Sequence, residues 1–272
     1  MNNNMTYQQQ YKKLVKDILV MPDIPNDRTK QTIQRYNGTI VLRHDNYGIP
    51  IVGGRKAYLH SGAAECAWFL MGTKNCDWLN EHTGMWKQWQ VNNEVTAGYG
   101  YRWRNALGYD QIEAAINNLK KDKTTRRIWI SSWDPKDDCN LNAINVPCPG
   151  GFYIDITNKK LNMSVVMRSS DVAVGLVYDT ITFRCLQAVI AASLKIDIGF
   201  LEFILINAHI YQNQKATITE LLKTNNLNVE INIPLLEWPL DKVLKNPDSF
   251  VNNYKKMQLL VPFPAIKMEV AI

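Results

Sequence analysis

The chain has 272 residues, of which 46% are hydrophobic and 21% are charged. This composition is apolar enough to form a large core, and it excludes an intrinsically disordered protein. No run of about 18 apolar residues exists, which excludes a membrane-spanning helix, and the Asn- and Gln-rich start predicts no secretory signal. The formal net charge of +6 suits an anionic partner, but the basic residues are too dispersed for an extended nucleic-acid footprint.

Cysteine usage argues against two further classes of protein. The five cysteines are scattered, and none belongs to a Cys-x-x-Cys pair. Zinc-binding and disulfide-stabilised frameworks are therefore poor interpretations, and no metal site is expected. The pattern fits a reducing cytoplasm, with one thiol open to a chemical role.

The predicted elements follow from hydrophobic spacing along the chain. Helical spacing or continuous apolarity predicts helices over residues 7–19, 56–71, 112–119, 180–194 and 209–224. Alternation and β-branched content predict strands over residues 39–42, 127–133, 152–156, 161–167 and 200–206. These elements do not alternate regularly, and no linker or repeat divides them. The sequence therefore predicts a single α+β domain over residues 1–272, in which a large mixed β-sheet is packed by helices.

Each chemically interesting residue has an ordinary interpretation beside a functional one. Cys148, between two prolines, is either a small apolar residue at the start of a strand or a nucleophile that a rigid backbone aims outward. Arg168 ends an apolar strand, where it can pair with Asp171 or bind a phosphate with its planar guanidinium. Glu65 lies in the most apolar predicted helix, where a carboxylate needs a partner or a raised pKa, which favours a functional role. His209 is most simply a structural hydrogen-bonding residue.

Four tryptophans complete the set of candidates. Trp78, Trp86, Trp89 and Trp103 are most simply core residues, although they can also form a stacking wall for a flat heterocycle. A possible thiol nucleophile, separate arginines, a buried Glu and aromatic walls together predict a planar, phosphorylated substrate that is attacked covalently.

Motifs along almost the whole chain resemble those of thymidylate synthase. Examples are Asn-Asp-Arg-Thr at 26–29, Ala-Glu-Cys-Ala-Trp-Phe-Leu at 64–70 and Arg-Ser-Ser-Asp at 168–171. Further matching blocks lie at residues 48–55, 86–89, 99–104, 126–127, 147–148, 175, 209–211 and 270–272. Lys30 stands where the family usually has Gly. So many independent blocks in one order identify the chain as a member of this family.

The resemblance implies how a nucleotide would be held and attacked. Cys148 would be the thiolate that attacks C6 of a pyrimidine deoxynucleoside monophosphate, after which C5 takes a one-carbon unit from 5,10-methylenetetrahydrofolate. His209 and Tyr211 would bind the 3′-hydroxyl of the sugar. The implied phosphate ligands are Arg28, Arg168, Ser169 and, from the second subunit of a homodimer packed sheet to sheet, Arg126 and Arg127.

The resemblance also implies a folate site and a route for protons. Asp171 would bind the pterin ring, and the carboxylate of Ile272 would close the site after folate binds. Glu65 would organise water and shuttle protons, and Tyr99 would assist removal of the C5 proton. The residues assigned to the folate site are Arg55, Trp86, Trp89, Asp171, Gly175 and Ile272.

Two departures from the family pattern bear on the substrate. Pro149 follows Cys148 where thymidylate synthases have His, and Asp179 stands where they have the Asn that reads the uracil edge. Cytosine presents a donor at N4 and an acceptor at N3, which is the reverse of uracil. A protonated Asp179 can accept from N4 and donate to N3, and an ionised one can do so if N3 takes the proton. Asp179 therefore favours dCMP over dUMP and resembles the deoxycytidylate hydroxymethylases of phages, unless its side chain points away from the base.

The fate of the one-carbon unit leaves alternatives open. Hydride transfer gives a methyl group, whereas water gives a hydroxymethyl group, and a closed dry site favours the first. Trp86, Trp89 and the synthase-like Val-Ala-Ile end favour closure, so the prediction is 5-methyl-dCMP. The alternatives are a dCMP hydroxymethylase and an ordinary thymidylate synthase acting on dUMP.

A non-enzymatic alternative is a basic nucleic-acid-binding module on the same fold, although a nucleic-acid partner is not expected. A cytoplasmic protein is predicted, in a phage-infected host if the phage resemblance extends to its source.

Overall fold

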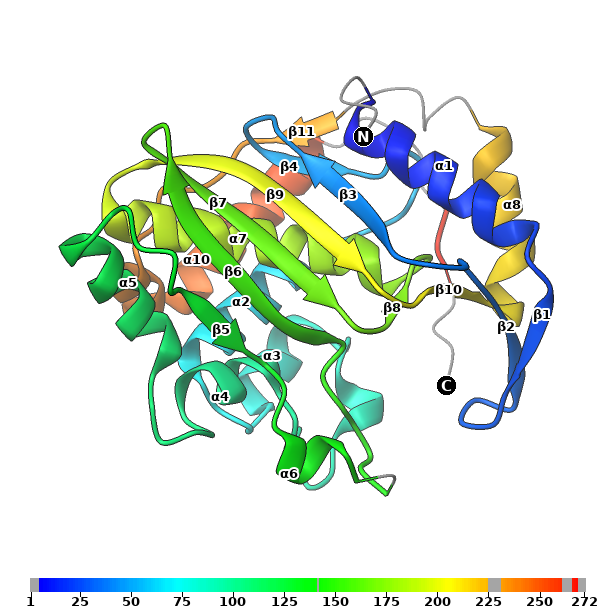
Figure 1. The fold of residues 1–272 in the computed structure, drawn as a ribbon, viewed down its shortest axis with the longest axis horizontal. Coiled ribbons are helices and arrows are strands. Elements are labelled where there is room, and N and C mark those ends of the chain that lie inside the picture. Colours follow the sequence, from blue (N-terminus) through cyan, green and yellow to red (C-terminus); the bar gives the residue numbers. More distant parts are fainter. Residues whose placement is uncertain (1–4, 141, 225–230, 261–265, 269–272) are drawn as a thin grey trace.

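A computed structural model of the chain describes residues 5–140, 142–224, 231–260 and 266–268 (Figure 1). Its largest sheet has five strands, and their spatial order is β3 (Ile40–His44), β9 (Asp197–Leu205), β7 (Lys160–Met167), β6 (Pro149–Thr157) and β5 (Trp129–Ser131). Strands β7 and β9 are parallel, and the other neighbours are antiparallel. The predicted α+β fold with a mixed sheet is confirmed.

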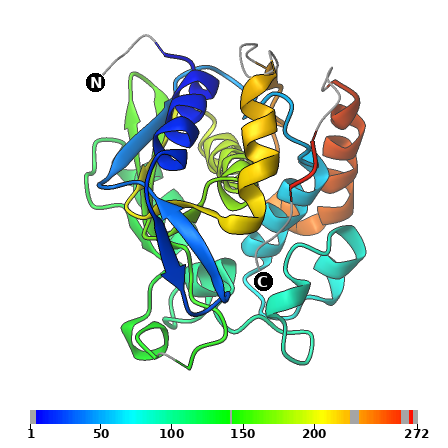
Figure 2. The same ribbon diagram turned by 90° about the vertical axis from the view of Figure 1, so that its right-hand side faces the viewer.

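The helices cover one face of this sheet. The central helix α7 (Gly175–Leu194) contacts α2 (Leu59–Met71), which in turn packs on α10 (Pro247–Met257). Figure 2 shows the sheet at one edge of the molecule, with these helices on its inner side only. Phe152 and Phe203 are fully buried on that inner side. Neighbouring residues Tyr153 and Glu202 alternate to the outer face and are only partly buried.

A second sheet carries several of the predicted site residues. Its order is β1 (Asp23–Asn26), β2 (Gln31–Arg35), β10 (Ala208–Tyr211) and β8 (Ser170–Asp171). Residues 209–211 were predicted to begin a helix, and this prediction is wrong. They are extended because β10 pairs with β2 on one side and with β8 on the other. A short 3-10 turn, η2 (Gln212–Gln214), then leads into helix α8 (Lys215–Lys223).

Local chemistry explains where the main helices begin and end. Helix α1 (Tyr7–Leu19) starts with a capping box between Thr6 and Gln9. Helix α2 ends at Gly72, whose φ of 67° is the left-handed conformation that favours glycine. The predicted start of α2 at residue 56 is three residues too early, because the backbone at 55–56 pairs instead with Ile266.

The remaining elements surround this framework. The described part of the chain contains no helix with both the length and the apolar composition needed to cross a membrane. The other described elements are β4 (Ile49–Ile51), which pairs with β11 (Ile231–Ile233), α3 (Asp77–His82), η1 (Lys87–Trp89), α4 (Tyr99–Arg104), α5 (Gln111–Lys121), α6 (Pro135–Asp138), α9 (Leu240–Lys245) and η4 (Gln258–Leu260).

Candidate active site

Cys148 lies immediately before β6, where an irregular register between Pro149 and Gly151 leaves it outside the regular ladder. Its backbone N–H donates to the Tyr99 hydroxyl at 3.3 Å, and its carbonyl accepts from the Arg168 N–H at 3.0 Å. Burial raises the pKa of the Cys148 thiol, and the charge of Asp179 raises it further. The Tyr99 hydroxyl and the charges of Arg168 and Arg28 lower it. The structure thus gathers four of the predicted residues around this sulfur atom.

Arg168 is held so that part of its guanidinium stays available. Its Nε donates to the Pro147 carbonyl at 2.9 Å and its Nη2 to the Val146 carbonyl at 3.4 Å. The guanidinium carbon lies 5.3 Å from the centre of the Trp133 ring. Asp171 does not serve as its partner, because that carboxylate accepts from two backbone N–H groups and from Gln214. Two carbonyls and one aromatic face therefore orient Arg168 and leave Nη1 free of these contacts.

Arg28 comes from the turn between β1 and β2. Its Nη2 donates to the Tyr211 hydroxyl at 3.0 Å, which joins the turn to β10. Lys30, in the same turn, has a φ of 54°, so the site where the family usually has Gly does adopt the left-handed conformation. Arg28 is exposed at the mouth of the site, and the half-buried Ser169 follows Arg168 on the facing segment.

His209 and Tyr211 face the same region from β10. The two rings meet edge to face with centres 5.0 Å apart. His209 is only 5% exposed, and its burial lowers the pKa of the imidazole despite the nearby Asp171. A neutral imidazole of this kind can donate or accept a hydrogen bond, as a sugar hydroxyl requires.

Glu65 is buried on α2 and has two side-chain partners. The Trp86 indole N–H donates to Oε1 at 2.6 Å, and the Thr182 hydroxyl lies 2.5 Å from Oε2. Burial raises the pKa of Glu65 to about 7, although both contacts lower it. The Thr182 hydroxyl is also 3.2 Å from the Gly62 carbonyl. Because a hydroxyl has one proton, Thr182 donates to Oε2 when Glu65 is ionised, whereas a protonated Glu65 can donate to Thr182 while Thr182 donates to Gly62.

Thr182 is a site residue that the sequence analysis missed. It lies three residues after Asp179 on α7, so both side chains project from one face of the helix. In the sequence, the only signal for Thr182 is its three-residue spacing from Asp179 within an apolar helix. A threonine with a purely structural role would show the same pattern.

Asp179 projects from α7 into the space beside Cys148 and Tyr99. Both of those groups interact electrostatically with it. Within the described residues, the Asp179 carboxyl makes no hydrogen bond or ion pair, and burial raises its pKa well above the ordinary value. The charges of Glu65 and Asp171 raise this pKa further. Burial and these two neighbouring charges therefore favour the protonated form of Asp179.

The residues assigned to folate differ in their contacts. Trp89 packs against Trp86 with ring centres 5.5 Å apart, and Trp86 uses its N–H on Glu65. Arg55 is 3% exposed, and its guanidinium donates to the backbone carbonyls of Ala173, Lys56 and Ile266. Arg55 thus connects the segment after Asp171 to the chain near its C-terminal end.

Other predicted residues lie apart from this cluster or outside the description. Gly175 begins α7, where an added Cβ would lie 3.7 Å from both Asp171 and Asp179. Arg126 and Arg127 are exposed just before β5, the edge strand of the large sheet. Ile272 lies outside the described residues, so its role stays a prediction. The described residues include no cluster of three or more metal-ligating side chains.

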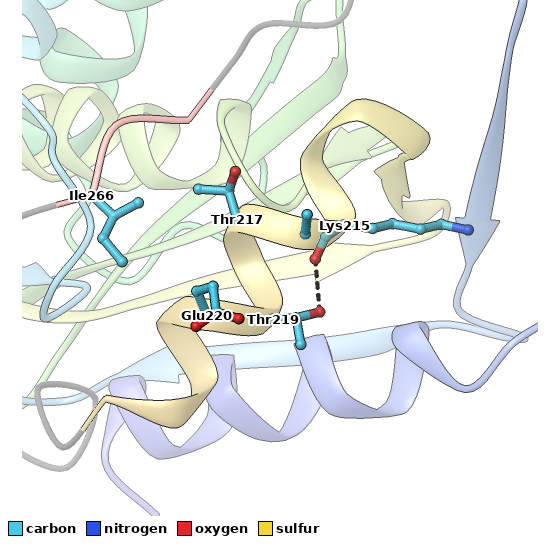
Figure 3. Close-up of a pocket in the computed structure, with 6 residues that line it drawn as sticks. Lys215, Thr217, Thr219, Glu220 and Ile266 are labelled. Carbon is cyan, nitrogen blue, oxygen red and sulfur yellow. Dashed lines mark hydrogen bonds between the residues drawn. The ribbon is translucent and has the colours of Figure 1, made fainter.

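Two open cavities flank the site without including Cys148. One, of about 690 Å³, is lined by the β1–β2 turn and Gln212. The other, of about 620 Å³, lies between α8 and Ile266 (Figure 3). In the close-up, the hydroxyl of Thr219 is turned back to the Lys215 carbonyl, 2.7 Å away, so it is used within α8.

These features bring a thiol, two arginines and buried acids together. Comparison with known proteins agrees: the thymidylate synthase family profile matches residues 9–272. The chain belongs to the thymidylate synthase family, which uses 5,10-methylenetetrahydrofolate as co-substrate.

Bacterial relatives match nearly the whole chain. The thymidylate synthase of Mycoplasma mobile is 28% identical, over 97% of this chain and 100% of the relative. That of Buchnera aphidicola is 30% identical, over 97% of this chain and 99% of the relative. That of Francisella philomiragia is 29% identical, over 83% of this chain and 85% of the relative.

Proposed function

We propose that the protein transfers a one-carbon unit from 5,10-methylenetetrahydrofolate to C5 of dCMP, giving 5-methyl-dCMP. The observation that carries the proposal is the unpartnered carboxyl of Asp179 beside Cys148, whose pKa is raised by burial. Its O–H can donate to cytosine N3 while its carbonyl oxygen accepts from the N4 amino group. Uracil N3 already carries a proton and cannot take one from Asp179, and an ionised Asp179 would be repelled by uracil O4 because both are acceptors.

The same carboxyl assists the chemistry at C6. Proton donation to N3 draws electrons from the ring and makes C6 easier for the Cys148 thiolate to attack. A protonated Asp179 would no longer raise the thiol pKa. Burial still raises this pKa, whereas the charges of Arg168 and Arg28 lower it and favour the thiolate. Glu65 and Tyr99 would exchange protons with the ring through water. Folate supplies the one-carbon unit and, for a methyl product, the hydride.

The folate residues favour a methyl product. Trp86 and Trp89 form an apolar wall that limits the access of water to the reacting carbon. Asp171 offers a fixed acceptor for a ring N–H. The hydroxymethyl product is the alternative if water does reach that carbon.

We further propose that the active form is a homodimer. The outer face of the large sheet carries no helix in the described structure, and Trp129 on it is 51% exposed. A second copy packed there would bring its exposed Arg126 and Arg127 toward the phosphate site. Residues 1–272 would then form one catalytic domain that is completed across the interface.

A second candidate is thymidylate synthesis from dUMP, because the curated relatives described above are thymidylate synthases. Tritium release from C5 of labelled dCMP or dUMP, measured with methylenetetrahydrofolate, distinguishes the two bases. The appearance of dihydrofolate absorbance distinguishes methylation from hydroxymethylation.

A matched variant tests the part played by Asp179. We expect Asp179→Asn to shift the ratio of kcat/KM from dCMP toward dUMP by about a hundredfold or more. Asp17→Asn, which removes only a helix-surface pair with Lys13, should leave the ratio unchanged. Turnover of dUMP and none of dCMP by the unmodified protein would overturn the proposal.

A further inference from the structure

Arg102 is a buried arginine surrounded by three aspartates. It lies on α4, three residues after Tyr99, and only 3% of its side chain is exposed. Its Nη1 contacts Asp134 at 3.0 Å and Asp137 at 3.1 Å, and its Nη2 contacts Asp138 at 3.0 Å. Its Nε is buried and has no hydrogen-bond partner.

The ion pairs of this cluster are expected to add little to the free energy of unfolding. Removing the charges of Arg102 and Asp138 from water costs free energy, because both side chains are nearly inaccessible. Three carboxylates also face one guanidinium, and the unpartnered Nε adds a further cost. Its geometric effect is strong, however, because one rigid guanidinium fixes two residues of α6 and its N-cap Asp134 to α4.

The segment that Arg102 contacts, residues 134–138, begins directly after Trp133. The ring of Trp133 faces Arg168. Asp138 reinforces the turn, since its Oδ2 accepts from the Asp134 N–H at 2.8 Å. The backbone N–H of Trp133 in turn donates to Gly150 at the start of β6, 3.3 Å away. The Trp133 backbone is therefore fixed between the Arg102 cluster, which begins at the next residue, and the strand that follows Cys148.

We infer that Arg102 is a positioning residue for Arg168. By fixing α6, it fixes the Trp133 face, and that face together with two carbonyls directs the free edge of the Arg168 guanidinium. The same Arg168 charge favours the Cys148 thiolate. One ion cluster remote from the substrate thus controls both phosphate binding and thiol ionisation. The inference rests on the proposed role of Arg168, but it does not depend on which base is used.

The test compares Arg102→Lys and Arg102→Met with Arg104→Lys in the full-length protein. Arg104 lies on the same helix and bonds Asp110 and the Leu70 carbonyl, away from Trp133, so it is a matched control. All variants carry Cys139→Ser, because Cys139 is exposed whereas Cys66, Cys76 and Cys185 are buried.

Two quantities are measured for each variant. We expect the dissociation constants of dCMP and dUMP to rise about tenfold or more in the Arg102 variants, with little change for the corresponding nucleosides. The pH midpoint of Cys148 alkylation by iodoacetamide should rise by roughly half a unit, because Arg168 is displaced. The Arg104 variant should change neither quantity.

Folding is checked by circular dichroism, and Asp137→Asn provides a milder perturbation. Asp137 is 51% exposed, so its loss leaves no buried charge behind and should give the same two effects at smaller size. Unchanged nucleotide affinity and alkylation in folded Arg102 variants would overturn the inference, as would equal weakening of nucleosides and nucleotides. If no pyrimidine nucleotide is turned over but both shifts occur, the proposed function fails and the positioning role stands.

Discussion

Replacing Glu65 with Gln should stabilise the protein in alkaline solution while it lowers activity. The Gln amide has the size and hydrogen-bonding pattern of a protonated Glu, with an oxygen for the Trp86 N–H and an NH₂ for the Thr182 hydroxyl. The variant therefore keeps both contacts without a group that ionises. General acid–base catalysis by Glu65 is lost, so kcat should fall by about a hundredfold or more.

The size of the stability gain follows from the raised pKa. Burial moves the pKa of Glu65 from 4.5 to about 7. At 1.36 kcal/mol for each pKa unit, the cost of ionising this carboxyl in the folded protein is about 3 kcal/mol. Because the folded protein binds the proton more tightly than the unfolded chain, stability falls as the pH rises from about 4.5 through 7. Glu65→Gln carries no such proton, so its advantage is absent at low pH and complete above pH 8.

Thermal unfolding without nucleotide, at one protein concentration and from pH 5 to pH 8, measures this difference. At about 2–4 °C for each kcal/mol, the melting temperature of the variant should exceed that of the unmodified protein by roughly 5–10 °C at pH 8 and by little at pH 5. A pH-independent difference, or a variant that is less stable at pH 8, would refute the argument that Glu65 is a buried carboxyl with a raised pKa.

Two further substitutions test contacts of the same framework. Thr182→Val removes the hydroxyl that donates to Glu65 when this carboxyl is ionised, so the pKa of Glu65 should rise and the matching limb of the kcat–pH profile should move alkaline by about one unit. Thr182→Ser should restore it, and an unmoved limb would speak against this contact. Gly100→Ala places a Cβ 2.1 Å from the backbone of Phe69, so urea unfolding should show a loss of roughly 3 kcal/mol or more. Gly84→Ala, which meets only the Lys87 side chain, should cost less than about 0.5 kcal/mol, and equal losses would contradict the packing of α4 on α2.

The parts of the fold that the sequence predicted correctly are those with long hydrophobic patterns. Helices α1, α2 and α7 and the β6–β7 hairpin were all found, because their apolar spacing extends over many residues. Residues 209–211 were misassigned because His-Ile-Tyr runs straight into a helical pattern. Their extended form depends on β2 and β8, which are distant in sequence. Strands β1 and β2 were missed, since their side chains are mostly exposed or half-buried and show no apolar alternation.

The candidate site divides in a similar way. Residues inside motifs, such as Cys148 and Glu65, could be named from the sequence because their residue types are unusual in apolar or proline-rich surroundings. Thr182 and Arg102 could not, since their importance comes from partners more than thirty residues away. Arg55 is the opposite case, because the family motif pointed to it from the sequence. Only the structure shows that its guanidinium donates to three backbone carbonyls.

The free carboxyl of Asp179 has an evolutionary consequence. Within the described structure no neighbouring side chain is committed to it, so no neighbour needs to change when this residue does. Asn and Asp have nearly the same size, and α7 would accept either without repacking. On the proposed function, a lineage could therefore exchange one pyrimidine for another by a single substitution at Asp179, with no change elsewhere in the site.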